Sequence, residues 1–181
     1  LDIATDPLVC ATLGAAACAV SATVDDGATG GDNSDVVAVD NDGPTNVDVE
    51  EGSTTGDGSS VVDVDGGAGD VVVDVENGST SGANAPVIDV ETTTGDQTIG
   101  VGSVTATGPG SDAIEADSVS GDIAITVRRR ASSTDGAAID ASTGGAVDIA
   151  ILPDAEVVGD EVALDIDAGG GSPLDNAGTI T

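Results

Sequence analysis

Carboxylates make up almost all of the reactive side chains in this sequence of 181 residues. There are 34 Asp and Glu residues against 3 Lys and Arg, no His or Tyr, and a formal net charge of −31. General-base and nucleophilic catalysis draws chiefly on His, Lys, Tyr and Cys, whereas carboxylate oxygens are the ligands that Ca²⁺ prefers. We therefore expect a protein that is not an enzyme, with Ca²⁺ as the candidate cofactor.

Acids recur at a fixed spacing between apolar residues. The members of the main series lie 25 or 26 residues apart: Asp63, Asp89, Glu115, Asp140 and Asp165. On stacked strands they would form an acidic ladder, in which neighbours about 5 Å apart repel by about 1 kcal/mol per pair even in water. Bound divalent cations, high salt, raised carboxylate pKa values or a basic partner would offset this repulsion. The alternative is a solvated acidic face that only confers solubility.

Four further aspartates near the N-terminus are candidate Ca²⁺ ligands. The segment 30–37 resembles one copy of the calcium-binding nonapeptide of RTX proteins, which implies that Asp32 and Asp35 are ligands. That family carries the nonapeptide in tandem, whereas the period here is about 26 residues. Asp40 and Asp42 lie in the sequence Asp40-Asn41-Asp42-Gly43, a short acidic turn of the kind that can hold an ion.

All of the side-chain positive charge lies in Arg128, Arg129 and Arg130. We expect these residues to pair with acidic neighbours in the same chain; the alternative is a basic knob that docks on the acidic face of another copy. For so negative a chain we expect no nucleic acid as a partner, and anionic membrane surfaces are poor partners too, because the dominant electrostatic term would be repulsive. The negative charge favours an extracellular or high-salt setting, where screening is strong.

Two apolar series keep the same period as the acids. They are Val37, Val62, Ile88, Ile114, Ile139 and Leu164, and Val47, Val73, Ile99, Ile125 and Ile149. A fixed period of roughly 20 to 50 residues is typical of stacked repeats, and a Ser/Thr segment at the same period adds a third face. The pattern predicts an all-β, parallel β-helix (β-solenoid) of about six turns, with about 26 residues in each. Disorder, which the absence of aromatic residues could indicate, is the alternative.

The composition divides the chain into three segments. Residues 1–34 are expected to form an apolar N-terminal cap or assembly segment, residues 35–168 the solenoid repeats, and residues 169–181 a Gly-rich break and a terminal strand. The uncharged stretch 8–24 is short and weakly hydrophobic for a membrane span, so we expect no membrane span in this chain. Cys10 and Cys18 are expected to form a disulfide, with two buried free thiols as the alternative.

Two short motifs resemble those of a known family. They are the ending Asn176-Ala177-Gly178-Thr179-Ile180 and the repeated openings Gly69-Asp70, Gly95-Asp96 and Gly121-Asp122. Together they resemble the repeats of bacterial autotransporter passenger domains and related β-helical surface adhesins. The resemblance implies a right-handed parallel β-helix that is exported to the cell surface.

Both ends of a solenoid are open strand edges, which invite pairing with another chain unless they are capped. We therefore expect an extracellular structural protein that stacks head to tail with itself into a surface or matrix filament. The expected assembly residues are Leu8, Val9, Leu13, Val20, Thr179 and Ile180. The alternatives are a monomeric cell-surface adhesin or passenger fragment, and a calcium- or ice-binding β-solenoid module.

Overall fold

The computed structural model describes residues 19–160 and 162–181, which form strands joined by turns, with no helix long and apolar enough to cross a membrane. One sheet contains β1 (Val20–Thr29), β3 (Thr45–Thr54), β5 (Val71–Thr80), β7 (Gln97–Ala106), β9 (Ile123–Ser133), β11 (Val147–Ile151), β12 (Glu156–Gly159), β14 (Leu174–Asn176) and β15 (Thr179–Ile180). We call it sheet A. Sheet B contains β2 (Val37–Asn41), β4 (Val62–Gly66), β6 (Ile88–Thr92), β8 (Ile114–Ser118), β10 (Ala137–Thr143) and β13 (Val162–Ala168).

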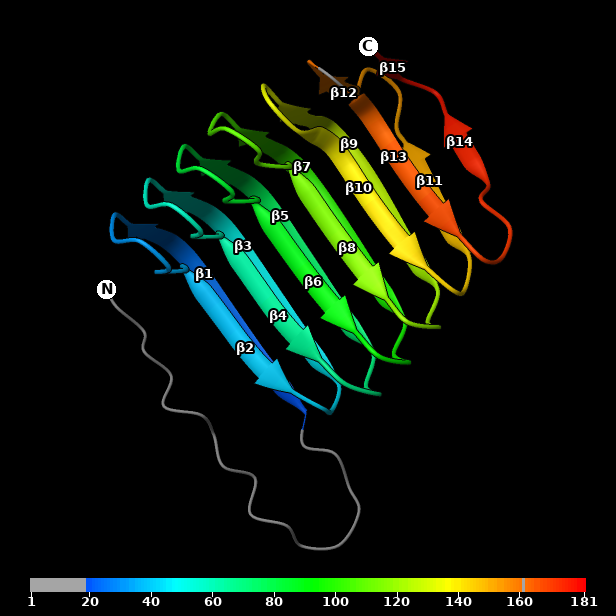
Figure 1. The fold of residues 1–181 in the computed structure, drawn as a ribbon, viewed down its shortest axis with the longest axis horizontal. Helices are drawn as coiled ribbons and strands as arrows, with labels where there is room; N and C mark the ends of the chain where they lie inside the picture. Colours follow the sequence, from blue (N-terminus) through cyan, green and yellow to red (C-terminus); the bar gives the residue numbers. More distant parts are fainter. Residues whose placement is uncertain (1–18, 161) are drawn as a thin grey trace, which may run out of the picture.

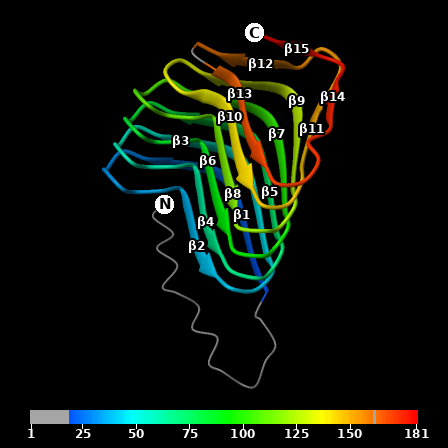
Figure 2. The ribbon, with the colours of Figure 1, turned by 45° about the vertical axis from the view of Figure 1, so that its right-hand side comes forward.

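The chain alternates between the two sheets, and all strand pairs are parallel. Each passage through sheet A and then sheet B makes one turn of a coil, which we call a rung. Figure 1 shows the rungs stacked from the N-terminal to the C-terminal end, with the two sheets facing each other, and Figure 2 shows the coil in a turned view. The predicted parallel β-solenoid of about six turns, repeating roughly every 26 residues, is confirmed.

Alternation decides which side chains form the core. In β3, Val47 and Val49 are fully buried between the sheets, while Asp48 and Glu50 are exposed on the outside. The residues stacked on this pair, from Val73 and Val75 to Ile149 and Ile151, are also buried. The narrow interior is therefore filled by Val, Ile and Ala, which explains how the chain forms a core without aromatic side chains.

The long strands of sheet A supply the third face predicted from the Ser/Thr segment. The pairing of β3 with β5 omits position 50, where Glu50 and Glu51 are exposed in succession and the strand turns a corner. After the corner Thr54 points inward, and its Oγ1 donates a hydrogen bond to the carbonyl of Ser59 at 2.6 Å. Thr80 donates in the same way to Ala85 at 2.6 Å. These threonines hold the turn that leads to sheet B.

The repeated Gly-Asp pairs stack one rung on the next. A Cβ atom on Gly95 or Gly121 would overlap the backbone of the preceding glycine in the column, so only glycine fits there. The aspartate that follows uses its carboxylate between rungs: Asp70 Oδ1 accepts from the N–H of Asp96 at 3.2 Å, and Asp96 Oδ1 from the N–H of Asp122 at 2.9 Å. The motif is thus a device for stacking, with no ligand required to explain it.

Two neighbouring positions in the interior exchange a large and a small side chain from one rung to the next. Gly52 and Gly78 face inward on β3 and β5, and each makes room for a valine that precedes sheet B; a Cβ on Gly78 would lie 2.5 Å from Val87 Cγ1. One rung later the glycine position holds Val104, and the valine position holds Ala113. The larger side chain therefore moves from the segment before sheet B to the strand of sheet A, and the interior stays filled.

The solenoid begins earlier than the sequence suggested. Residues 20–29, which we assigned to the cap or assembly segment, form β1 and pair with β3 in register. The reason is that Ala22, Val24 and Gly27 match Val47, Val49 and Gly52 on β3. At the other end, β14 and β15 continue sheet A by pairing with β11 and β12, so the terminal strand belongs to the stack.

Candidate functional site

The outer face of sheet B carries the acidic ladder expected from the sequence. The side chains pair in register in the order Asp63, Asp89, Glu115, Asp140 and Asp165, and Ala38 on β2 precedes them. A second column lies two residues on, with Asp40, Asp65, Glu91, Asp117, Ser142 and Asp167. Since every Arg lies elsewhere, neither column contains a cationic neighbour on the same strands.

Crowding and burial change the protonation of this face. Burial, with the nearby charges of Asp35, Asp65 and Glu91, raises the pKa of Asp63 to about 6. Burial, with Glu115 and Asp63 as the next causes, raises the pKa of Asp89 to about 7. Burial also raises the pKa values of Glu115 and Asp140. Proton uptake is therefore one way in which the face relieves its repulsion.

The predicted calcium ligands do not converge. Among residues 19–160 and 162–181, no three acidic or Cys side chains come together as a metal-binding group. Asp32 Oδ1 instead accepts a hydrogen bond from the N–H of Asp57 at 3.2 Å, and Asp35 Oδ1 one from the N–H of Ser60 at 2.7 Å. Asp40 and Asp42 are exposed. In the structure Asp32 and Asp35 serve inter-rung stacking, and a calcium role for the acids stays a prediction.

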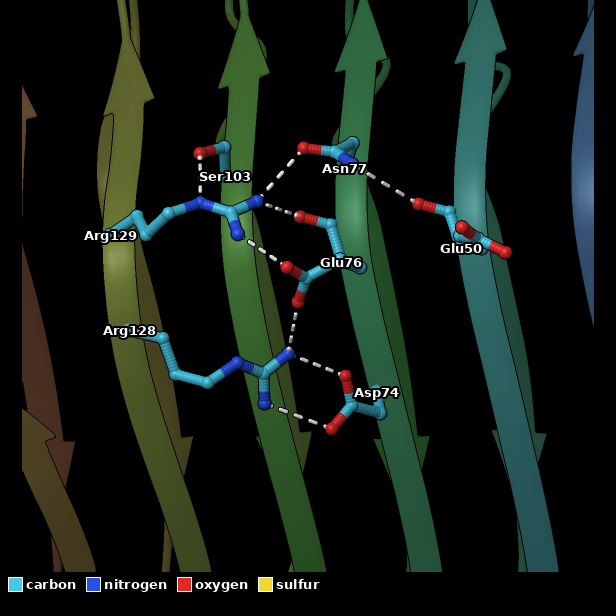
Figure 3. A network of polar contacts seen from close by, with 7 residues as sticks. All are labelled: Glu50, Asp74, Glu76, Asn77, Ser103, Arg128 and Arg129. Carbon is cyan, nitrogen blue, oxygen red and sulfur yellow. Dashed lines mark hydrogen bonds and ion pairs between the residues drawn. The ribbon is translucent and has the colours of Figure 1, made fainter.

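The outer face of sheet A carries a network of ion pairs that spans three strands (Figure 3). Arg128 on β9 reaches across β7 to β5, where its Nη1 lies 2.9 Å from Asp74 Oδ2 and its Nη2 lies 3.2 Å from Glu76 Oε2. Arg129 also reaches Glu76, and it donates to Asn77 Oδ1 at 2.9 Å and to Ser103 Oγ at 3.2 Å. The two guanidinium groups tie β9, β7 and β5 together from outside.

Two glycines on β7 make this reach possible. Gly100 lies between Asp74 and Thr126 in register, and a Cβ there would lie 2.8 Å from Arg128 Nη1 and 3.1 Å from Asp74 Oδ2. A Cβ on Gly102 would overlap the backbone carbonyl of Glu76 and lie 2.8 Å from Arg129 Nη2. Because both positions lack side chains, the arginines cross β7 against its bare backbone.

An extra residue in β9 lengthens the run of outward-facing side chains at the corner. Val101 pairs with Val127 and Ser103 with Arg130, so one residue of β7, Gly102, stands opposite two residues of β9. This is the geometry of a β-bulge, which re-aims the side chains at the bulge. The corner by itself leaves two successive side chains outside, as with Glu50 and Glu51, and the extra residue makes it three: Arg128, Arg129 and Arg130.

All three arginines make intramolecular ion pairs, since Arg130 Nη1 lies 2.8 Å from Glu156 Oε2. This is the pairing within the chain that the sequence led us to expect. Sequence reasoning missed the roles of Asp74, Gly100 and Gly102. The available signal was the pair of glycines at outward positions, two residues apart, one rung before the arginines.

A shallow groove borders the network toward the N-terminal end. It has a volume of about 510 Å³, and it is lined by Thr23, Val24, Asp25, Asp48, Glu50, Asp74, Glu76 and Arg128. Asp48 lies directly beside Asp74 in register and has no arginine within ion-pair distance. The groove thus presents acids that attract cations.

The expected disulfide and most of the expected assembly residues fall outside the described part of the chain. They are Leu8, Val9, Cys10, Leu13 and Cys18. Val20 opens β1 at the N-terminal end of the stack, and Thr179 and Ile180 form β15 at the C-terminal end. The described assembly residues therefore occupy opposite end layers.

Comparisons of the chain with protein-family models, with curated proteins and with solved structures find no significant match.

Proposed function

We propose that this protein is a non-enzymatic, extracellular structural subunit that stacks head to tail into a filament of a cell surface or matrix. The observation that supports stacking is the state of the two end layers. Within the described residues, β1 pairs only with β3 and β2 only with β4, while β13, β14 and β15 each have one partner. Each end therefore presents backbone N–H and C=O groups on an open strand edge.

The apolar columns also run out to both ends. Ala22 and Val24 on β1 are only partly buried, in contrast to Val47 and Val49 one rung later. At the other end Leu164 and Ile166 are partly buried, and Leu174 is 49% exposed. Covering these side chains with the next copy would extend the apolar interior through the junction.

A head-to-tail contact joins two different surfaces, so it grows into an open filament unless its rotation closes a ring. A rod with parallel strands across its axis transmits the same contact from copy to copy. The extracellular setting is supported by the charge of −31, which strong screening or divalent ions would make tolerable at high local density.

Electron microscopy of the purified chain over a range of concentrations, joined to sedimentation velocity, tests the proposal. We expect thin unbranched fibres of constant width whose length grows with concentration. Short isolated rods at every concentration would overturn stacking and leave a monomeric surface adhesin as the better reading.

The same preparation with calcium and after chelation tests the role of the acids. Loss of fibres on chelation would assign bridging cations to the acidic ladders. Fibres that persist in chelator would assign these acids to solubility.

A further inference from the structure

The two ends of the solenoid carry complementary residues in the columns of sheet A. One outward column runs from Thr23 on β1 through Asp48 and Asp74 to Asp175 on β14. Another runs from Asp26 on β1 to Thr179 on β15. Each column therefore ends in a carboxylate at one end of the rod and in a threonine hydroxyl at the other.

From this we propose that β1 of one copy pairs in parallel with β14 and β15 of the preceding copy, in the register that the internal rungs use. The inference rests on the proposed head-to-tail stacking and specifies its junction. In that register Thr23 would stand beside Asp175 of the preceding copy, and Asp26 beside its Thr179. A threonine hydroxyl donates a hydrogen bond to a carboxylate, so both contacts are favourable.

Size is complementary in the same register. Leu174, half exposed at the C-terminal end, would stack on Ala22, and Ile180 would stack on Gly27. Large residues at one end thus meet small residues at the other. The exception is Asn176 opposite Val24, where the amide oxygen already accepts a hydrogen bond from the N–H of Gly178 at 2.9 Å.

Charge favours this junction, because it avoids the like-charged pairs that occur inside the stack. Inside the stack Asp48 stands beside Asp74, a like-charged pair, and the column then reaches the ion pair of Asp74 with Arg128. The two end positions, by contrast, would bring no like-charged pair together in either sheet A column. An end layer of Asp instead of Thr23 would have placed two carboxylates about 5 Å apart.

Sheet A is the sheet that this junction makes continuous. Among the described strands sheet A has one layer more than sheet B, so the junction leaves one sheet B layer between β13 and the β2 of the next copy that no described strand fills.

The test is a charge introduced at the junction and its rescue. Thr23→Asp would face Asp175 of the neighbouring copy, and we expect the dissociation constant of the head-to-tail contact to rise about fivefold, the factor that corresponds to one such repulsion. Adding Asp175→Asn to this variant should return the dissociation constant toward that of the wild type. Ala38→Asp is the matched control, because it also sets a new carboxylate beside an aspartate of the next rung, Asp63 in place of Asp48, but on sheet B and away from Asp175.

Circular dichroism first establishes that all variants fold, and sedimentation over a range of concentrations then gives each dissociation constant. A wild-type chain that never assembles would overturn both the filament and its junction. A wild-type chain that assembles while Thr23→Asp behaves as Ala38→Asp does would overturn this register and leave head-to-tail stacking in place. Failure of Asp175→Asn to rescue Thr23→Asp would likewise overturn the register.

Discussion

The guanidinium group of Arg128 holds the carboxylate of Asp74 in a two-point contact although a whole strand, β7, lies between their own strands. Charged partners on adjacent strands are common, but a pair that skips a strand needs a gap in the side chains between them. Gly100 provides that gap. The network therefore links three rungs, and its energy depends on residues that carry no charge.

A double-mutant cycle should measure the contribution of this pair. With Arg128→Ala and Asp74→Ala we expect a coupling free energy of about 0.5–1 kcal/mol at low salt that falls as ionic strength rises, because both side chains are partly exposed. Urea unfolding of the four chains gives the coupling. The pair of Arg130 and Glu156, a single contact between more exposed side chains, is the control and should couple less. Equal couplings would contradict a special role for the two-point contact.

The two glycines beneath the network should differ in their tolerance of a methyl group. Gly102→Ala should lower the free energy of unfolding by about 1–3 kcal/mol, because its Cβ would overlap the rigid carbonyl of Glu76. Gly100→Ala should cost less, since its Cβ would meet only the mobile ends of Arg128 and Asp74. Thermal unfolding of the two variants, side by side, checks the order. A larger loss for Gly100→Ala would show that the arginine network matters more than backbone spacing.

The exchange of volume inside the coil predicts compensation between two residues. Gly78→Ala should destabilise the fold by about 1–3 kcal/mol through its clash with Val87, and Val87→Ala should destabilise it by leaving a cavity. The double variant should lose less than the sum of the two, because it reproduces the Ala131 and Ala138 arrangement found two rungs later. Strict additivity in denaturant unfolding would show that the two side chains do not share space.

The acidic face of sheet B predicts an unusual dependence of stability on pH. The pKa values of Asp63 and Asp89 rise from 3.8 to about 6 and about 7, so the native chain binds more protons than the unfolded chain between these limits. The free energy of unfolding should therefore decrease as pH rises from about 4 to about 7, and then level off. Thermal melts at a series of pH values in constant salt check this.

Asparagine variants test whether the carboxylates of the acidic ladder cause this dependence on pH. Asp89→Asn should raise the melting temperature at pH 8 more than at pH 5, since it removes a carboxylate whose charge the fold disfavours. Asp148→Asn, on an exposed side chain of β11 in sheet A, controls for the general loss of charge. A stability that rises between pH 4 and pH 7 would contradict the stacked arrangement of these acids.

The regular part of the molecule could be predicted from the sequence because each rung repeats the same pattern of buried and exposed residues. Val, Ile and Ala alternate with Asp and Thr at a spacing of 25 or 26 residues, and that spacing places like residues on one another. The acidic ladder of sheet B followed from the same register. The Gly-Asp repeat was also visible in the sequence, but its role in stacking the rungs could be seen only in the three-dimensional structure.

The irregular parts could not be read in the same way. The bulge in β9 adds a single residue, and a shift of one residue is lost in a period that already varies between 25 and 26. The cross-strand pairing of Arg128 with Asp74 depends on the missing side chain of Gly100. The placement of β1 was missed because Asp25 and Asp26 interrupt its apolar alternation at the corner, where both side chains face outward.

The columns of stacked glycines at the turns set a constant distance between rungs. Because the backbone of one rung occupies the space beside the glycine of the next, the spacing at these corners is fixed by main-chain contact and does not depend on side-chain volume. The length of the rod can therefore change only by whole rungs. Duplication of one rung, about 26 residues, would lengthen the rod by about 4.8 Å and leave the contacts between the other rungs unchanged. Evolution or engineering could set the span of such a rod by counting repeats.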